Sequence, residues 1–288
     1  MISVILLSKR ENLSEFNLHQ ANLEKINLVN ATMKNSDLSK SNLKNASLYG
    51  INLSGSNLFK SNLKSANLNG ANLENCNLLG ANLTNTKLRN IKWGENYKVI
   101  NELEAENAYK KGDIELANKK YKEAEDVYRS IKISMQSQTL GNDTGEFFIR
   151  EMIVQRKQFS KFSPRRIGSK IIEITTGYGE NLGNIIFTIL GIIITCMILY
   201  GIEGVYYGDP VHGDRIIGFF TKDIENFGLL NTIGNLFYFS VVVYSTVGFG
   251  EIIPIGPLGK SIVIFEGIIG GLVLAILIIA LYKKAMDR

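Results

Sequence analysis

The sequence predicts a multidomain membrane protein in which a repeat domain, a short helical connector and an all-α membrane domain follow one another along 288 residues. Three observations predict this order: a five-residue period over residues 11–90, helical spacing between residues 93 and 159, and long uncharged segments between residues 183 and 282. Two cysteines and two histidines exclude a disulfide framework and a histidine-rich metal centre. A net charge of +5 gives little support to nucleic-acid binding, and no nucleic-acid partner is expected.

The first third of the chain repeats every five residues. From Leu13 to Leu88, each of the sixteen central positions is Leu except Met33, and Asn stands before the centre in twelve of the sixteen repeats. The position two before the centre is small or apolar from Phe16 onward. A period of five fits neither the one-faced pattern of a helix nor that of a strand. It indicates a chain that turns a corner every five residues and points two rows of side chains inward.

These repeats, for example ANLNGANL at residues 66–73, resemble the pentapeptide-repeat family. The resemblance implies a right-handed quadrilateral β-helix, which we assign to residues 1–95, with the start at residues 1–7 as a capping strand. It implies no activity and leaves open an unknown cytoplasmic protein or ligand as partner. Residues 11–90 carry eight basic and five acidic side chains, a net of +3. That charge disfavours the DNA mimicry of some family members and favours a scaffold or assembly module.

Residues 96–160 are expected to form a helical connector. Gly112 followed by Asp113 marks a helix end and the next N-cap, and Gly141 with Asn142 and Asp143 repeats that arrangement. Residues 108–117 are similar to the turn of a tetratricopeptide repeat. We therefore expect two or three packed helices, with a peptide-binding groove as the alternative. One predicted helix face, spaced by three and four residues, consists of Ala117, Tyr121, Ala124, Tyr128, Ile131 and Met135.

A basic segment precedes the first long uncharged one. Six Lys or Arg residues lie between residues 156 and 170 with no acidic residue among them, and Ile167, Ile171 and Ile174 follow helical spacing. Each basic side chain gains about 1 kcal/mol near anionic lipid. We therefore expect residues 161–182 to be an interfacial segment at the inner face of the membrane.

Two segments are long and apolar enough to cross a bilayer as helices. Residues 183–202 carry no charge, and residues 261–282 carry only Glu266. Basic residues lie before the first span and after the second, whereas residues 203–225 carry two basic and five acidic residues. By the positive-inside tendency, the chain is a multi-pass protein of the cell membrane with both termini cytoplasmic. The uncharged segment 226–250 must then enter and leave by the outer face, which implies a pore.

The re-entrant segment ends in a short glycine-containing motif, Thr246, Val247, Gly248, Phe249 and Gly250, followed by Glu251. With the two spans, this motif resembles the selectivity filter of two-span potassium channels, and residues 183–288 resemble their pore domain. The resemblance implies a homotetramer in a lipid bilayer. Backbone oxygens of Thr246, Val247, Gly248 and Phe249 would then replace the water shell of K⁺. The glycines supply the positive φ that aligned carbonyls need, and four copies of Glu251 at the outer mouth attract cations.

Two positions depart from the commoner potassium-channel pattern. Phe249 stands where many relatives have Tyr, and it offers no hydroxyl to tether the filter. Val242 stands behind the filter, at a position where some relatives have a buried carboxylate. In those relatives, the carboxylate bonds the residue that corresponds to Glu251. With both polar anchors lost, we expect a less firmly braced filter with altered inactivation, while K⁺ selectivity over Na⁺ is retained.

The second span contains two further candidate sites, a pair of glycines and a glutamate. Gly270 and Gly271 fall where the resemblance places a gating hinge, and close helix packing is the alternative. Glu266 costs roughly 2.5 to 3.5 kcal/mol if it faces lipid at the bilayer centre, so we expect it to point toward the pore helix or the filter base. A structural and a functional hydrogen bond of Glu266 remain equally open.

A potassium-selective channel, with the repeat domain acting in assembly or gating, is the leading interpretation. One alternative is a non-selective cation channel, and another is a membrane-tethered adaptor whose repeats bind a protein partner. An enzyme is the weakest interpretation, because the sequence lacks a nucleophile–base pair, a phosphate loop and metal-ligand spacing. No cofactor is expected besides K⁺ as the permeant ion.

Overall fold

The fold is described from a computed structural model, which covers residues 12–138, 141–208 and 213–286. The chain divides into two compact units, Met1–Ile171 with Lys284–Arg288, and Ile172–Lys283. Each unit is described by itself. The predicted capping strand at residues 1–7 lies outside the described residues.

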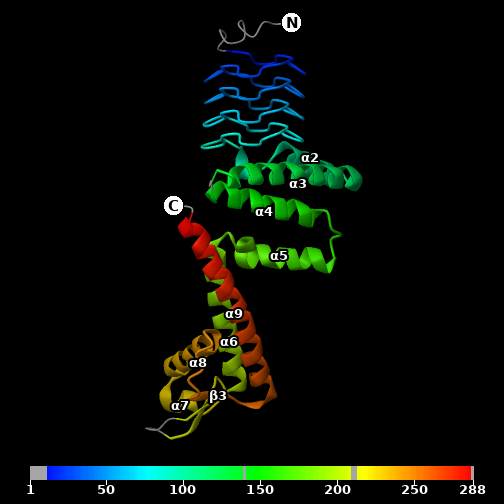
Figure 1. The fold of residues 1–288 in the computed structure, drawn as a ribbon. Helices are drawn as coiled ribbons and strands as arrows, with labels where there is room; N and C mark the ends of the chain where they lie inside the picture. Colours follow the sequence, from blue (N-terminus) through cyan, green and yellow to red (C-terminus); the bar gives the residue numbers. More distant parts are fainter. Residues whose placement is uncertain (1–11, 139–140, 209–212, 287–288) are drawn as a thin grey trace. The chain divides into compact units, whose positions relative to one another are not determined.

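The repeats form a coil with four repeats per turn. Parallel bridges join each residue before a central Leu to the residue twenty positions later, from Asn12 with Thr32 to Asn72 with Lys92. The central Leu side chains are buried in one continuous core. Figure 1 shows the coils as a stack of flat layers at the blue end of the chain. The prediction of a four-sided coil is therefore confirmed.

Each corner of the coil uses a left-handed residue. The residue two after each central position has a positive φ in all sixteen repeats, for example 59° at Lys25, 59° at Asn45 and 72° at Gly70. This conformation suits Gly and Asn, which occupy many of these corners. The Asn before the centre supports the turn from outside: the Asn62 side chain accepts from the Lys64 amide at 3.2 Å and donates to Asn42 at 3.1 Å.

Polar side chains in the second inward row, two residues before the central Leu, form hydrogen bonds with the preceding coil. The side chains of Ser56, Cys76 and Thr86 donate to main-chain carbonyls 23 residues earlier, at 2.6, 2.9 and 2.8 Å. These small polar groups are therefore satisfied inside a narrow core. Burial raises the pKa of the Cys76 thiol to about 12, so the thiol stays protonated and unreactive.

Three helices follow the repeats, after a short turn, η1 (Glu95–Tyr97). They are α2 (Ile100–Lys110), α3 (Ile114–Gln136) and α4 (Gly141–Lys157). All six side chains of the predicted helix face are buried, and Asp113 caps α3 by accepting from the Leu116 amide at 2.9 Å. Gly141 was expected to end a helix, but α3 already ends at Gln136 and Gly141 is the first residue of α4. The predicted position of this helix end is therefore wrong. The expected two or three packed helices are present.

Side chains of α3 and the turn after it take the place of the next coil. Gln138 accepts from the Leu88 amide at 3.2 Å and donates to the Thr86 carbonyl at 2.5 Å. Ser134 donates to the Leu83 carbonyl at 2.8 Å. A further coil would have met the same main-chain groups, so α3 closes the hydrogen-bonded edge of the solenoid. Repeats and connector therefore form a single unit with one apolar core.

A buried cluster of charges joins α2, α3 and α4. The fully buried Glu102 accepts from the Tyr128 hydroxyl at 2.5 Å and pairs with Lys157 at 3.2 Å. Glu106 pairs with both Lys157 and Lys98 at 2.9 Å. Burial alone would raise the pKa of the Glu106 carboxyl, but the hydrogen bonds from Lys157 and Lys98 outweigh it and hold that pKa below its ordinary value.

The second unit contains two long apolar helices, α6 (Leu182–Glu203) and α9 (Gly256–Met286), and both are long and apolar enough to cross a membrane. A shorter apolar helix, α8 (Leu229–Tyr244), lies between them in sequence and packs against α6. The helix α5 (Pro164–Thr176) and the turn η2 (Gly177–Gly179) precede α6, and α7 (Asp223–Phe227) precedes α8.

The second unit is not all-α, which corrects the sequence-based fold class of the predicted membrane domain. The strands β1 (Val205–Tyr207), β2 (Arg215–Ile217) and β3 (Ile252–Pro254) form an antiparallel sheet in the order β2-β1-β3. Val205 lies opposite both Ile217 and Pro254. Each strand has three residues, too few for an alternating pattern to stand out in the sequence. Because β3 closely follows the glycine motif, the sheet fixes the C-terminal end of that motif.

Candidate functional site

The pore-helix candidate α8 passes directly into the glycine motif. The amides of Ser245, Thr246 and Val247 donate back to the carbonyls of Val241, Val243 and Val242 at 2.9, 3.0 and 3.1 Å. These bonds extend the helix end by three residues. The first residues of the motif are therefore held by α8 itself.

The backbone of the motif alternates in handedness. Thr246, Gly248 and Gly250 have φ values of 58°, 60° and 84°, whereas Val247 and Phe249 are not among the residues with positive φ. A Cβ added at Gly248 or Gly250 would meet no atom within 4 Å, so conformation and not space calls for glycine at both positions. A chain that alternates in this way is suited to turning consecutive carbonyls toward one side.

Glu251 is tied to α8 by a residue that the sequence did not single out. The Tyr238 hydroxyl on α8 donates to the Glu251 carboxylate. Val242 is buried and offers no polar group, as expected, but the tether comes from one helical turn earlier. The expectation that Glu251 has lost its polar anchor is therefore wrong. A Tyr four residues before a Val in an apolar helix was the available signal.

Glu266 lies inside the second unit and touches both other apolar helices. Its side chain is fully buried and accepts from the Ser240 hydroxyl on α8 at 2.5 Å and from the Tyr200 hydroxyl on α6 at 2.7 Å. Glu266 thus faces α8, the predicted pore helix, which is the direction expected from the cost of exposing a carboxylate to lipid. Neither Ser240 nor Tyr200 was singled out by sequence, although both are polar residues within apolar helices.

The two adjacent glycines of α9 have different surroundings. A Cβ added at Gly270 would lie 2.8 Å from the Tyr244 carbonyl oxygen, so α9 approaches the end of α8 closely there. A Cβ added at Gly271 would meet no atom within 4 Å. α9 continues as one helix through both residues. Close packing accounts for Gly270, whereas only Gly271 is free of a packing requirement.

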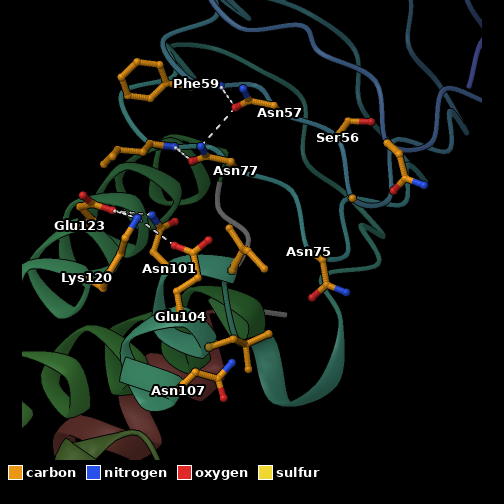
Figure 2. A pocket seen from close by; sticks show the side chains of 15 residues that line it. Ser56, Asn57, Phe59, Asn75, Asn77, Asn101, Glu104, Asn107, Lys120 and Glu123 are labelled. Carbon is orange, nitrogen blue, oxygen red and sulfur yellow. Dashed lines mark hydrogen bonds and ion pairs between the residues drawn. The ribbon is translucent and has the colours of Figure 1, made fainter. Parts of the chain in front are cut away.

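A second candidate site lies in the first unit, between the repeats and the helices α2 and α3. Figure 2 shows this cleft, whose volume is about 810 Å³. Lys120 pairs with Glu104 at 2.8 Å and with Glu123 at 2.9 Å, while the Asn101 amide donates to Glu123 at 3.1 Å. The repeat side contributes Asn57, Asn77 and Phe59. In the described part of the chain, no group of His, Cys, Asp and Glu is arranged to hold a metal ion.

The helix α5 combines exposed apolar and basic side chains. Ile167, Ile171 and Ile174 are half or more exposed, and Arg165 and Lys170 are exposed on the same short helix. Thr176 is its one buried residue. This composition suits a helix whose apolar face is covered by a lipid interface.

Comparison with known proteins finds a family match in each of the two units. Residues 214–286, which include β2, α8, the glycine motif and all of α9, match the ion-channel family. Residues 17–55 and 56–92 match pentapeptide repeats in eight copies. The chain joins pentapeptide repeats to an ion-channel domain. Two apolar helices of sufficient length are consistent with a membrane location for this domain.

Solved structures similar to the chain cover its repeats. The pentapeptide repeat protein Rfr23 from the cyanobacterium Cyanothece 51142 is 44% identical over 31% of this chain and 59% of its own, with a TM-score of 0.30. A pentapeptide repeat protein from Nostoc PCC 7120 is 34% identical over 30% of this chain and 72% of its own, with a TM-score of 0.29. The chain thus spans about three fifths of the length of the first. No curated protein matches it.

Proposed function

We propose that this protein is a potassium-selective channel, formed by four copies of the chain around the motif Thr246–Gly250. The observation that carries the proposal is the alternation of handedness along the motif, with positive φ at Thr246, Gly248 and Gly250. The backbone oxygens of Thr246, Val247, Gly248 and Phe249 bind dehydrated K⁺ in successive rings. The Tyr238–Glu251 tether holds the outer end of the motif, and four Glu251 side chains attract cations to the mouth.

Assembly into a homotetramer is supported by the apolar surface of one chain. Val247 and Phe249 are 55% and 69% exposed, and α9 exposes Ile264, Phe265 and Ile268 to a similar extent. One chain supplies one wall of a pore, so a closed ring of chains is needed to surround an ion. In the tetramer, neighbouring chains and lipid cover these side chains.

The proposed topology places both termini in the cytoplasm and both α6 and α9 across the cell membrane. The helix α5 lies on the inner surface of the bilayer, with its basic residues near anionic headgroups. The working domains are residues 1–95, 96–160, 161–182 and 183–288. The tetratricopeptide-like turn at residues 108–117 then belongs to the cytoplasmic part.

The gate is proposed to open by bending of α9 at Gly270 and Gly271. Gly271 has space for such a change, whereas Gly270 must leave its contact with Tyr244 when the helix bends. The unit of repeats and connector acts in assembly or gating, because its single core allows it to move as one rigid body. The solenoid therefore needs no internal hinge to transmit a displacement.

A second candidate function is a membrane-tethered adaptor. The cleft beside Phe59 and Asn77 favours it, because a polar cleft on a rigid repeat surface suits a protein or ligand partner (Figure 2). In this case, the pore domain serves as an anchor, and purified protein carries no current.

Ion flux from reconstituted liposomes tests the proposal. Liposomes that contain the full-length protein are expected to take up Rb⁺ when an outward K⁺ gradient drives the uptake. In a K⁺/Na⁺ gradient, the reversal potential is expected to lie close to that of K⁺. Chemical cross-linking of the detergent-solubilised protein is expected to trap four chains. A reversal potential near zero would establish a non-selective cation channel instead. Background uptake together with monomeric protein would remove the channel and favour the adaptor.

A further inference from the structure

The carboxylate of Glu266 lies in the interior of the second unit and bonds both other apolar helices. Its two oxygens take separate partners, Ser240 on α8 and Tyr200 on α6. All three side chains are fully buried. The Ser240 hydroxyl also lies 2.9 Å from the Ile193 carbonyl of α6, so this residue of α8 contacts both α9 and α6.

The partners of Glu266 are neutral. In residues 141–208 and 213–286, no Lys or Arg forms an ion pair with Glu266, and its two hydrogen-bond donors are the hydroxyls of Ser240 and Tyr200. The Tyr200 ring packs edge-on against Phe239, the neighbour of Ser240, with centroids 4.8 Å apart. A buried carboxylate supplied with hydroxyl donors in this way fixes the positions of all the groups that surround it.

The same face of α9 contacts α8 again one turn later. Gly270 is four residues after Glu266, and its contact atom, the Tyr244 carbonyl, is four residues after Ser240. Tyr244 is two residues before Thr246, the first residue of the proposed filter. Two successive turns of α9 therefore set the position of the last turn of α8, from which the filter begins.

We propose that Glu266 is a positioning residue for the filter: through Ser240 and Tyr200 it clamps the pore helix between the outer and inner helices and keeps the filter in its conducting form. The inference deepens the proposed channel function and rests on it. Glu266 does not line the pore, because it is fully buried in a single chain against α6, behind α8. Its effect on conduction is exerted through the helix that carries the filter.

Single-channel recording of the full-length protein in planar bilayers tests the proposal. We compare wild type with Glu266→Gln, Ser240→Ala and Tyr200→Phe. Loss of a hydrogen bond to a carboxylate is expected to shorten the mean lifetime of the conducting state by about tenfold. The unitary conductance and the K⁺/Na⁺ reversal potential are expected to stay at their wild-type values. The Ser240→Ala effect should be smaller in the Glu266→Gln background than in wild type, because the amide of Gln is a weaker partner for the Ser240 hydroxyl than the carboxylate.

Matched controls remove hydroxyls that do not touch Glu266. Thr195 on α6 and Ser261 on α9 bond to carbonyls of their own helices at 2.7 and 2.9 Å. Thr195→Val and Ser261→Ala are therefore expected to leave the lifetime unchanged. Wild-type lifetimes in Glu266→Gln would overturn the proposal. So would a changed unitary conductance with a normal lifetime, since that result would place Glu266 in the ion pathway.

Hydrogen exchange separates failure of this inference from failure of the channel function. In detergent, Glu266→Gln is expected to speed amide exchange in residues 240–250 by about tenfold and to leave residues 43–70 unchanged. This readout needs no current, so it applies even when wild type proves silent. Unchanged exchange in residues 240–250 would show that Glu266 does not hold the pore helix, whatever the flux experiment gives.

Discussion

The solenoid and the filter use the same backbone device at different frequencies. In the solenoid, one residue in five has a positive φ, and twelve of these sixteen corners carry a side chain other than Gly. In the filter, Thr246, Gly248 and Gly250 give one such residue in two. The solenoid spreads this strain over many equivalent corners, and the amides of the first twelve, from Glu15 to Gly70, bond to the next coil. The filter concentrates it in five residues that have no repeated neighbour, and we expect it to tolerate far less change.

The largest expected effect comes from adding one methyl group to a left-handed glycine in each region. An L side chain in this conformation costs about 1 to 2 kcal/mol, and Gly248→Ala applies that cost to every wall of the pore. We expect Rb⁺ uptake to fall at least about 100-fold, since misaligned carbonyls no longer replace the water shell of the ion.

The matched change in the solenoid is Gly70→Ala, where the nearest atom to a new Cβ is 3.9 Å away. It is expected to lower stability by about 1 kcal/mol and to leave uptake unchanged, as measured by thermal unfolding and flux on the same preparation. Equal losses of uptake in the two variants would break the comparison.

The next largest effect concerns the end of the solenoid. Gln138→Ala removes the side chain that bonds Leu88 and Thr86, so the last coil is expected to lose about 1 to 3 kcal/mol of local stability. Hydrogen exchange of residues 83–90 in the full-length protein measures this loss against residues 43–50. Gln136→Ala, an exposed position in the last turn of α3, is the control and is expected to change neither region. Equal exchange in both Gln variants would mean that α3 does not close the edge.

A smaller effect is expected at the outer end of the filter. Tyr238→Phe removes the tether to Glu251 and is expected to speed loss of current under sustained voltage by about threefold to tenfold. Tyr282→Phe, an exposed tyrosine of α9, is the control. Phe249→Tyr tests the addition of a polar tether. We expect the current to be sustained for longer if the new hydroxyl forms a hydrogen bond with the pore helix. Unchanged current decay in Tyr238→Phe would show that the tether has no mechanical role.

The smallest effect is a dependence of stability on pH in the connector. The folded pKa of Glu106 lies below its ordinary value of 4.5, so its stabilising contribution is present above that value. The contribution is lost as pH falls through the lowered pKa. In Glu106→Gln, the unfolding midpoint is expected to fall less between pH 7 and pH 3 than in wild type, by no more than about 3 °C. Identical pH profiles would contradict the assignment of the Lys98 and Lys157 pairs.

The periodic parts of the fold were predictable from sequence. The leucine period fixes which side chains point inward, because a coil of four repeats returns each position over itself after twenty residues. The helix face from Ala117 to Met135 follows from spacing alone. The sequence also indicated glycine at the two filter positions that have positive φ, but it did not indicate that Thr246 shares this conformation.

The missed features depend on contacts between residues far apart in the chain. Glu266 bonds Ser240 and Tyr200 across 26 and 66 residues, and Gln138 bonds main-chain groups about fifty residues earlier. No local pattern encodes such a pairing, because helix packing decides which faces meet. The three-residue strands were missed for a different reason, since their pairing partners and not their own periodicity define them.

The twenty-residue turn of the coil restricts how evolution can change its length. Removing one whole turn, for example residues 37–56, joins Ser36 to Asn57 in an equivalent register and shortens the stack by one layer without rotating either end. Removing a single repeat instead rotates everything beyond the excision by a quarter turn about the stack axis. The helices that close the stack would then point in a new direction. Gain or loss of repeats in multiples of four preserves the direction of these helices. Gain or loss of any other number of repeats rotates them about the stack axis in steps of a quarter turn.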